Sequence, residues 1–162
     1  RCHVLKIACL AQIVNVIAPI LTTPTGLIKQ TIFYPFKLFR QFARGNSLDA
    51  LVHSPLYTTQ KYGDTPVLDV SASHDPASND QAVFLVNRSQ SDALPVEIVW
   101  QNIAPKQVTA VQLTGVDPKM VNNFDQPNSI LPVARAGQPV VDKMTRNLLP
   151  PLSFSVLLGR GA

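Results

Sequence analysis

The chain has 162 residues, which is enough for one compact domain and too few for two domains of ordinary size. Hydrophobic residues make up 46% and charged residues 15%, a composition that excludes an intrinsically disordered protein. The net charge of +4 comes from scattered Lys and Arg residues that form no run, and this pattern argues against nucleic-acid binding.

The first predicted element is the apolar run KIACLAQIVNVIAPI, residues 6–20. Gln12, Asn15 and Pro19 interrupt it before it reaches the roughly 18 to 20 residues that span a bilayer, so no membrane segment is predicted. Basic residues precede it as in a secretory signal, but Lys6 lies beside the apolar core and no clear small-residue cleavage pattern follows. Its first half predicts a strand that is buried on both faces, as parallel strands are, and that ends near Gln12.

An amide in the middle of an apolar run needs an explanation. A buried Gln without partners costs about 1–3 kcal/mol, so Gln12 requires a structural partner, a water molecule or a ligand. Cys2 and Cys9 are too few for a disulfide framework and lack the spacing of metal ligands. They predict one terminal thiol and one core thiol in a reducing compartment.

The stretch QTIFYPFKLFRQFARG, residues 30–45, predicts an amphipathic helix of about ten residues after a TTPTG loop. Pro35 suits the first turn of this helix, where its missing N–H would have no partner, and Gly45 suits the helix end. Apolar residues recur at helical spacing on the packing side: Phe36, Leu38, Phe39, Phe42 and Ala43. The other side carries Lys37, Arg40, Gln41 and Arg44.

After Ser47 the hydrophobic pattern changes to a period of two. Seven short runs separated by turn-forming residues predict an antiparallel sandwich. The runs are residues 47–54, 66–73, 81–89, 94–101, 106–116, 138–145 and 152–160. The residues expected in the core are Leu51, Val70, Phe84, Val86, Ile98, Trp100, Val111, Leu113, Phe154 and Val156.

Four motifs follow one another in a recognisable order. They are KIACLAQIVNVIAPILT (6–22), QTIFYPFKLFRQFARG (30–45), HSPLYTTQKYGDTPVLDVSAS (53–73) and FLVNRS (84–89). In this order they resemble the C-terminal third of the α-L-arabinofuranosidases of glycoside hydrolase family 51. The likeness is specific from Val4 to Ser89 and continues more loosely through LPVEIVW to the terminal LPPLSFSVLLGR.

The resemblance implies a (β/α)8 catalytic barrel followed by a β-sandwich of jelly-roll type. Residues 1–46 would then supply the final strand, loop and helix of a truncated barrel, and residues 47–162 the C-terminal sandwich. The expected fold class is therefore mainly β, an antiparallel sandwich preceded by the last β/α unit of a barrel. One such unit cannot close a barrel, so the isolated chain should expose an apolar patch.

The resemblance also implies two substrate-binding residues. Active sites of (β/α)8 enzymes lie at the C-terminal ends of the strands, where Gln12 matches the family glutamine in ACLAQ that hydrogen-bonds the arabinofuranosyl ring. An amide offers donors and acceptors to a sugar hydroxyl; the alternative is that Gln12 satisfies barrel backbone. Asn15 lies further into the loop, either near the ligand or bonded to its own turn.

No catalytic residue is predicted in this chain. A retaining glycosidase needs two carboxyl groups, and the family carries both as glutamates on earlier barrel strands. The single glutamate, Glu97, alternates with Val96 and Ile98 as the outward residue of a sandwich strand. The chain alone should therefore be inactive, and no cofactor is expected.

Other candidate residues give weaker signals. The three histidines have no Cys or carboxylate at ligand spacing, so no metal site is predicted at His3, His53 or His74. Ser54 lacks the glycine elbow of a serine hydrolase. Asn87 begins the sequon NRS, but it matches a strand end of the family and is expected to be structural. Three aromatic residues could line a sugar platform or pack inside the protein: Tyr57, Tyr62 and Trp100.

Three functions remain open. The first is the C-terminal part of a cytoplasmic, retaining α-L-arabinofuranosidase that acts on terminal non-reducing α-L-arabinofuranosyl residues of oligosaccharides. Its partners would be the missing N-terminal barrel, the oligosaccharide bound through that barrel, and further copies in a homo-oligomeric parent. The alternatives are a stand-alone, non-catalytic carbohydrate-binding sandwich and an interface domain without a ligand. Only the first explains the β/α unit predicted over residues 6–45.

Overall fold

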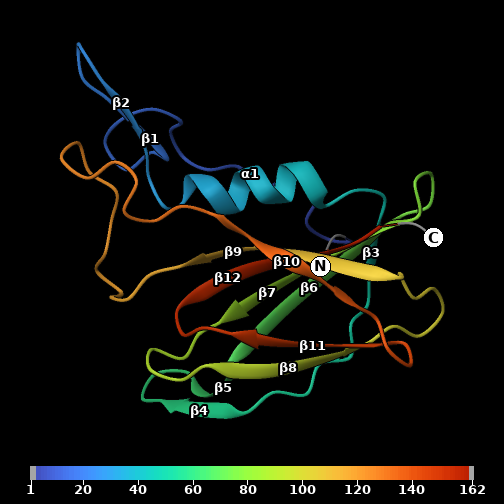
Figure 1. The fold of residues 1–162 in the computed structure, drawn as a ribbon. Helices are drawn as coiled ribbons and strands as arrows, with labels where there is room; N and C mark the ends of the chain where they lie inside the picture. The colour runs from blue at the N-terminus through green and yellow to red at the C-terminus, as the bar shows by residue number, and fades with distance from the viewer. Residues whose placement is uncertain (1–2, 161–162) are drawn as a thin grey trace.

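The computed structural model describes residues 3–160, which form one helix and twelve strands (Figure 1). In chain order the elements are β1 (Ile20–Thr22), β2 (Leu27–Lys29), α1 (Phe33–Phe42), β3 (Asn46–Leu48), β4 (Leu56–Thr59), β5 (Gly63–Pro66), β6 (Leu68–Asp75), β7 (Asp80–Asn87), β8 (Leu94–Val99), β9 (Gln107–Thr114), β10 (Val133–Pro139), β11 (Met144–Leu149) and β12 (Ser153–Gly159).

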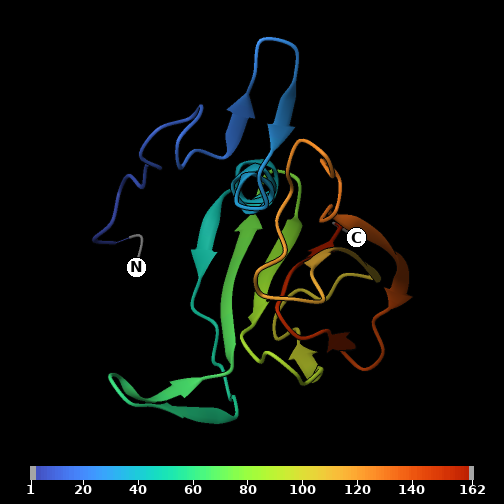
Figure 2. The ribbon, with the colours of Figure 1, turned by 90° about the vertical axis from the view of Figure 1, so that its left-hand side faces the viewer.

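The elements form three layers, of which a central sheet is the middle one. This sheet has six antiparallel strands in the order β10-β9-β12-β7-β6-β3. Helix α1 lies against one face, which we call the helix face, and the paired strands β8 and β11 cover the other, the ribbon face (Figures 1 and 2). The β1–β2 and β4–β5 hairpins project from opposite ends of this body (Figure 2).

The middle strands β7 and β12 are apolar on both faces because each face is covered. Successive side chains of a strand point to opposite faces, so Leu85 and Leu157 pack on the ribbon face with Trp100. Phe84 and Val156 pack on the helix face against α1. The sheet therefore supports two apolar cores, one on each side.

Helix α1 confirms the predicted helix, and Leu38, Phe39 and Phe42 of the predicted packing side contact the sheet. Pro35 lies in its first turn, and Gly45 follows its end with a φ of 69°. A Cβ at Gly45 would collide with the carbonyl oxygen of His74, so this position requires glycine. Tyr34 and Leu38 are buried against the sheet. Phe36, expected on the packing stripe, is half exposed.

The strand expected between Lys6 and Gln12 is absent from the described chain, where residues 5–10 are irregular and exposed. A parallel strand needs hydrogen-bonded neighbours on both sides, and residues 3–160 provide none for it. Cys9, expected in the core, is exposed for the same reason. Cys2 lies outside the described residues. Within residues 3–160, no helix is long and apolar enough to cross a membrane.

Five of the seven predicted sandwich strands coincide with β6, β7, β8, β9 and β12. The run 47–54 forms a strand only at its start, as β3. The run 138–145 was wrong as a single strand, because Asp142 and Lys143 take positive φ values of 51° and 59° in a turn between β10 and β11. Those two strands and the β1–β2 and β4–β5 hairpins were not predicted.

The predicted core was right in composition but wrong in its geometry. Trp100, Leu113 and Val156 are buried, whereas Leu51 is 84% exposed beyond the short strand β3. Val70, Ile98, Val111 and Phe154 are partly buried against the core clusters. Phe84 and Val156 face the helix, whereas Val70 and Trp100 pack on the ribbon face. A period of two cannot reveal that both faces of a strand are covered.

Truncating the core on the ribbon face should destabilise the protein strongly. We expect Leu85→Ala to lower the free energy of unfolding by about 2–5 kcal/mol, because Leu85 is 1% exposed in the centre of the sheet. The matched control is Leu148→Ala, which removes the same atoms from a side chain that is 66% exposed. Urea unfolding compares the two variants, and equal losses would contradict the assigned core.

Candidate functional site

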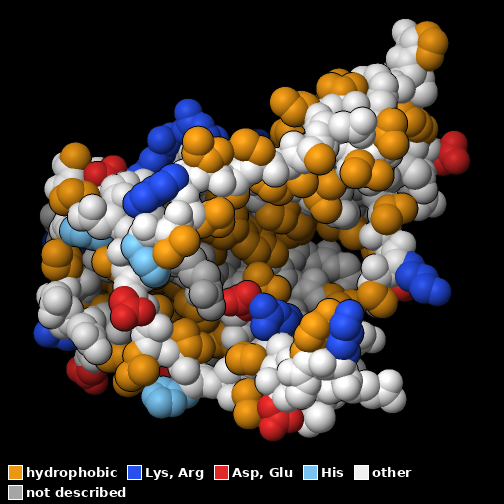
Figure 3. All heavy atoms as spheres, turned by 180° about the vertical axis from the view of Figure 1, so that it is seen from behind, with side chains coloured by type: hydrophobic (Ala, Val, Ile, Leu, Met, Phe, Trp, Pro, Cys, Tyr) orange, Lys and Arg blue, Asp and Glu red, His pale blue; other side chains and the backbone are white. Residues whose placement is uncertain are grey.

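The candidate site lies in the N-terminal segment, residues 3–22, which carries both predicted substrate-binding residues. Its large apolar side chains are turned outwards rather than into the core. The exposed members are Val4, Leu5, Ile7, Leu10, Ile13, Val14, Val16 and Ile17. Seen from behind, the molecule shows hydrophobic side chains gathered in a hollow at the centre of the face (Figure 3). The predicted exposed apolar patch is therefore present.

Gln12 is exposed and has a φ of 70°, a value that is uncommon for a residue other than glycine. Within residues 3–160 its side-chain amide makes no hydrogen bond. It is not buried without a partner, so the energetic penalty expected for a buried amide does not arise in this chain. Its donor and acceptor atoms both remain available.

Asn15 forms a compact set of hydrogen bonds with Thr22, the last residue of β1. The Thr22 backbone N–H donates to Asn15 Oδ1 over 2.7 Å, and Asn15 Nδ2 donates to Thr22 Oγ1 over 3.0 Å. The Asn15 backbone N–H also donates to the carbonyl of Ile20 over 2.8 Å. These contacts correspond to the structural alternative for Asn15, an amide that bonds its own turn.

Asn122 connects this segment to the body of the protein. Its side chain is 1% exposed and lies in the loop between β9 and β10. Asn122 Nδ2 donates to the carbonyls of Lys29 on β2 and Ile130, over 2.9 and 3.0 Å, and Oδ1 accepts from the Ile130 N–H over 2.8 Å. Asn122 thereby fixes the β1–β2 hairpin, and with it the segment that carries Gln12.

The described residues contain no group of three or more potential metal ligands. Glu97 is the outward residue of β8, as predicted, and pairs with Arg146 over 2.8 Å at the surface. His74 hydrogen-bonds Asn79. Ser54 Oγ donates to the Pro55 carbonyl and accepts the Leu68 N–H, and neither bond activates a nucleophile.

The predicted aromatic candidates do not form one platform. Trp100 is buried and donates from Nε1 to Thr145 Oγ1, so it belongs to the core. Tyr57 and Tyr62 are exposed on and beside the β4–β5 hairpin, away from Trp100.

Burial raises the pKa of the Tyr34 hydroxyl, so this group stays neutral inside the helix–sheet contact.

Asn87 has the structural role that the sequence predicts. It is 1% exposed and donates from Nδ2 to the carbonyls of Asp92, Leu149 and Pro150. These bonds close the turn between β7 and β8 and join it to β11. A buried amide with these partners is inaccessible to a glycan-transferring enzyme.

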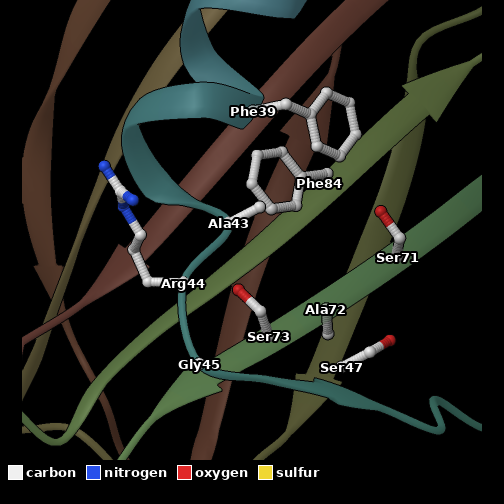
Figure 4. Close-up of a pocket in the computed structure, with 9 residues that line it drawn as sticks. All are labelled: Phe39, Ala43, Arg44, Gly45, Ser47, Ser71, Ala72, Ser73 and Phe84. Atoms are coloured by element: carbon white, nitrogen blue, oxygen red, sulfur yellow. The ribbon is translucent and has the colours of Figure 1, made fainter. Parts of the chain in front are cut away.

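A pocket of about 210 Å³ lies where α1 ends above the sheet (Figure 4). The stacked rings of Phe39 and Phe84, with centroids 4.1 Å apart, close one side. Ser47, Ser71 and Ser73 line another, and the Arg44 side chain points away from them (Figure 4). The lining contains no carboxylate and no histidine, so the pocket offers hydroxyl groups and aromatic rings but no acid–base pair.

Sequence reasoning missed two residues of the site, Thr22 and Asn122. Their partners lie 7 and up to 93 residues away in the chain. A buried Asn in a turn-rich stretch such as VDPKMVNNFDQPNS has no pattern that distinguishes it from exposed neighbours. Thr22 belongs to a quoted motif, but nothing in that motif indicates its partner.

A family model and curated relatives match nearly the whole described chain. The family model described as the α-L-arabinofuranosidase C-terminal domain matches residues 1–153. An intracellular exo-α-(1→5)-L-arabinofuranosidase of Streptomyces lividans is 38% identical over 151 residues, which cover 92% of this chain and 23% of the relative. The intracellular exo-α-(1→5)-L-arabinofuranosidase 1 of Bacillus subtilis is 32% identical over 154 residues, which cover 94% of this chain and 30% of the relative.

Solved structures agree with the sequence comparison. A family 51 α-L-arabinofuranosidase from Bifidobacterium longum superposes with a TM-score of 0.82 at 28% identity, covering 93% of this chain and 30% of that enzyme. The chain thus spans between 23% and 30% of the length of these relatives. All three matches are to much longer proteins.

Loss of the Asn122 side chain should detach the N-terminal hairpin from the body. We expect Asn122→Ala to lower the free energy of unfolding by about 1–3 kcal/mol, because the Ile130 N–H and the Lys29 carbonyl lose their partner. Asn128→Ala, an exposed residue of the same loop, should change it by less than about 0.5 kcal/mol. Amide hydrogen exchange at Ile130 should accelerate only in Asn122→Ala; unchanged exchange would contradict this role.

Proposed function

Because the chain belongs to the family of α-L-arabinofuranosidase C-terminal domains, we propose that it works as the C-terminal part of a retaining α-L-arabinofuranosidase. The enzyme would release terminal non-reducing α-L-arabinofuranosyl residues from oligosaccharides without a cofactor. The observation that carries the proposal is the family match over residues 1–153, which includes the Gln12 segment and every strand of the central sheet except β12. The relatives named intracellular support a cytoplasmic enzyme.

The proposed division of labour follows from the positions of carboxyl groups. Retaining hydrolysis requires a nucleophile and an acid/base about 5–5.5 Å apart. Glu97 cannot supply either role, since it is held by Arg146 on an outward strand face. The catalytic carboxylates would therefore belong to a barrel preceding this domain. We propose that residues 1–46 complete this barrel and that residues 47–162 form its jelly-roll sandwich.

The exposed apolar N-terminal segment supports this arrangement over a stand-alone sugar-binding module. An independent module would gain nothing from exposing Val4, Ile7, Ile13 and Val16 to water. A barrel would bury these side chains and give the segment the neighbouring strands that a parallel strand needs. In that setting Gln12 would lie at the C-terminal edge of the last strand, where its amide could bind a sugar hydroxyl.

The chain by itself should not hydrolyse an aryl α-L-arabinofuranoside above the uncatalysed rate. The two catalytic glutamates of the family have no counterpart in this chain, and Glu97, its single glutamate, lies on an outward strand face. A full-length protein in which this chain follows its barrel should be active under the same conditions. Release of the aryl alcohol measures both, and hydrolysis by the chain alone would overturn the proposed division of labour.

In the full-length protein, Gln12→Ala should lower kcat/KM while leaving the melting temperature almost unchanged. Loss of one ligand-facing amide removes about 1–3 kcal/mol of transition-state binding, which corresponds to roughly five- to 150-fold in rate. Gln101→Ala, an exposed amide in the loop after β8, serves as the matched control and should have no effect. A large loss of stability with unchanged kcat/KM would make Gln12 a structural residue.

A further inference from the structure

The loop that carries Gln12 has a strained backbone. Gln12, Asn15 and Val16 have φ values of 70°, 64° and 59°, three left-handed residues within five positions. This region is disfavoured for L-residues and most of all for a β-branched residue such as Val16. Such conformations persist only where surrounding contacts hold them. The conformation of this loop therefore depends on the contacts that hold it.

Those contacts converge on the pair Asn15 and Thr22. Asn15 Oδ1 accepts the Thr22 N–H over 2.7 Å, and Thr22 Oγ1 lies 3.0 Å from Nδ2 and 3.2 Å from Oδ1. The side-chain amide thus extends the pairing of β1 beyond the isolated bridge between Val14 and Ile20. The Asn15 side chain thus accepts the Thr22 N–H of β1, a bond that a backbone carbonyl of a neighbouring strand would otherwise accept.

The base of this pair is anchored in the protein. Ala18 and Pro19 are buried, and the Pro19 carbonyl accepts the Gln30 N–H over 2.8 Å. The Ala18 N–H donates to the Asn15 carbonyl over 3.1 Å. Asn15 is therefore held by both its backbone and its side chain, whereas Gln12 makes no side-chain hydrogen bond within residues 3–160. The place of the Gln12 amide depends on the backbone that leads to Asn15.

From this geometry we propose that Asn15 and Thr22 form a clamp that positions Gln12 for the arabinofuranosyl ring, an inference that rests on the proposed function. Asn15 and Thr22 are positioning residues rather than ligands, because the Asn15 acceptor is already occupied by Thr22. Of the two amides in the loop, that of Gln12 makes no side-chain hydrogen bond within residues 3–160, whereas that of Asn15 is bonded to Thr22. The clamp acts on the ligand through Gln12 alone.

The test is a double-mutant cycle between Asn15 and Gln12 in the full-length protein. Asn15→Gly removes the side chain and tolerates the φ of 64° at this position, so it adds no new strain. We expect it to lower kcat/KM on an aryl α-L-arabinofuranoside by about 10- to 100-fold, the size of effect that displacement of a binding group by about 1 Å produces. In a Gln12→Ala background the same change should lower kcat/KM by no more than about two-fold.

Thr22 supplies an independent arm of the test. Thr22→Val removes the hydroxyl while keeping the shape of the side chain, and should lower kcat/KM several-fold. Thr22→Ser keeps the hydroxyl and should stay within about two-fold of the parent protein. Thr25→Val, at the tip of the β1–β2 hairpin, is the matched control and should have no effect. This arm decides the question if Asn15→Gly fails to fold.

The outcomes separate this proposal from the proposed function. Equal losses from Asn15→Gly with and without Gln12 would show a merely structural role and overturn the clamp. Thr22→Ser as impaired as Thr22→Val would do the same. Unchanged kcat/KM in Gln12→Ala would instead overturn the substrate-binding role of Gln12, on which the clamp rests. Melting temperatures are measured for Asn15→Gly in the parent protein and in the Gln12→Ala background. A merely structural role of Asn15 would lower the melting temperature equally in both.

Discussion

The rest of the structure depends on one constraint, the apolar surface that β7 and β12 present on both faces. A sheet buried on one side only would carry polar residues at Phe84 and Val156, but these are as buried as Leu85 and Leu157. Water must therefore be excluded from both faces. Helix α1 covers one and the β8–β11 ribbon the other, and this requirement explains why a helix from outside the sandwich pattern is an integral part of the body.

The helix links that constraint to the candidate site. It lies between the β1–β2 hairpin and the sheet in the chain, and its stacked contact from Phe39 to Phe84 fixes it on the helix face. Asn122 then joins the hairpin to the loop between β9 and β10 from the other side. The Gln12 segment is consequently held at its C-terminal end by buried contacts, while its own apolar side chains remain exposed.

The buried amides of Asn87 and Asn122 serve structure. Buried amides close turns and join loops, as at Asn87 and Asn122, where each donor or acceptor compensates a backbone group that would otherwise lie unpaired. The carboxylates lie at the surface, and Glu97 has its partner in Arg146. A domain of this composition can support and shape an active site without contributing acid–base groups to it.

The mainly β class, the helix near residues 33–42, most strands of the central sheet and the resemblance to family 51 enzymes could be predicted from the sequence, because these depend on local periodicity and on motif order. The sequence could not assign Phe84 and Leu85 to different cores, since alternation does not reveal what covers each face. It missed β10 and β11, because the positive φ values at Asp142 and Lys143 replaced an apparent strand with a turn. The hydrogen bonds from Asn15 to Thr22 and from Asn122 to Lys29 could not be predicted, because they join residues that are separated in the sequence and are brought together by the tertiary fold.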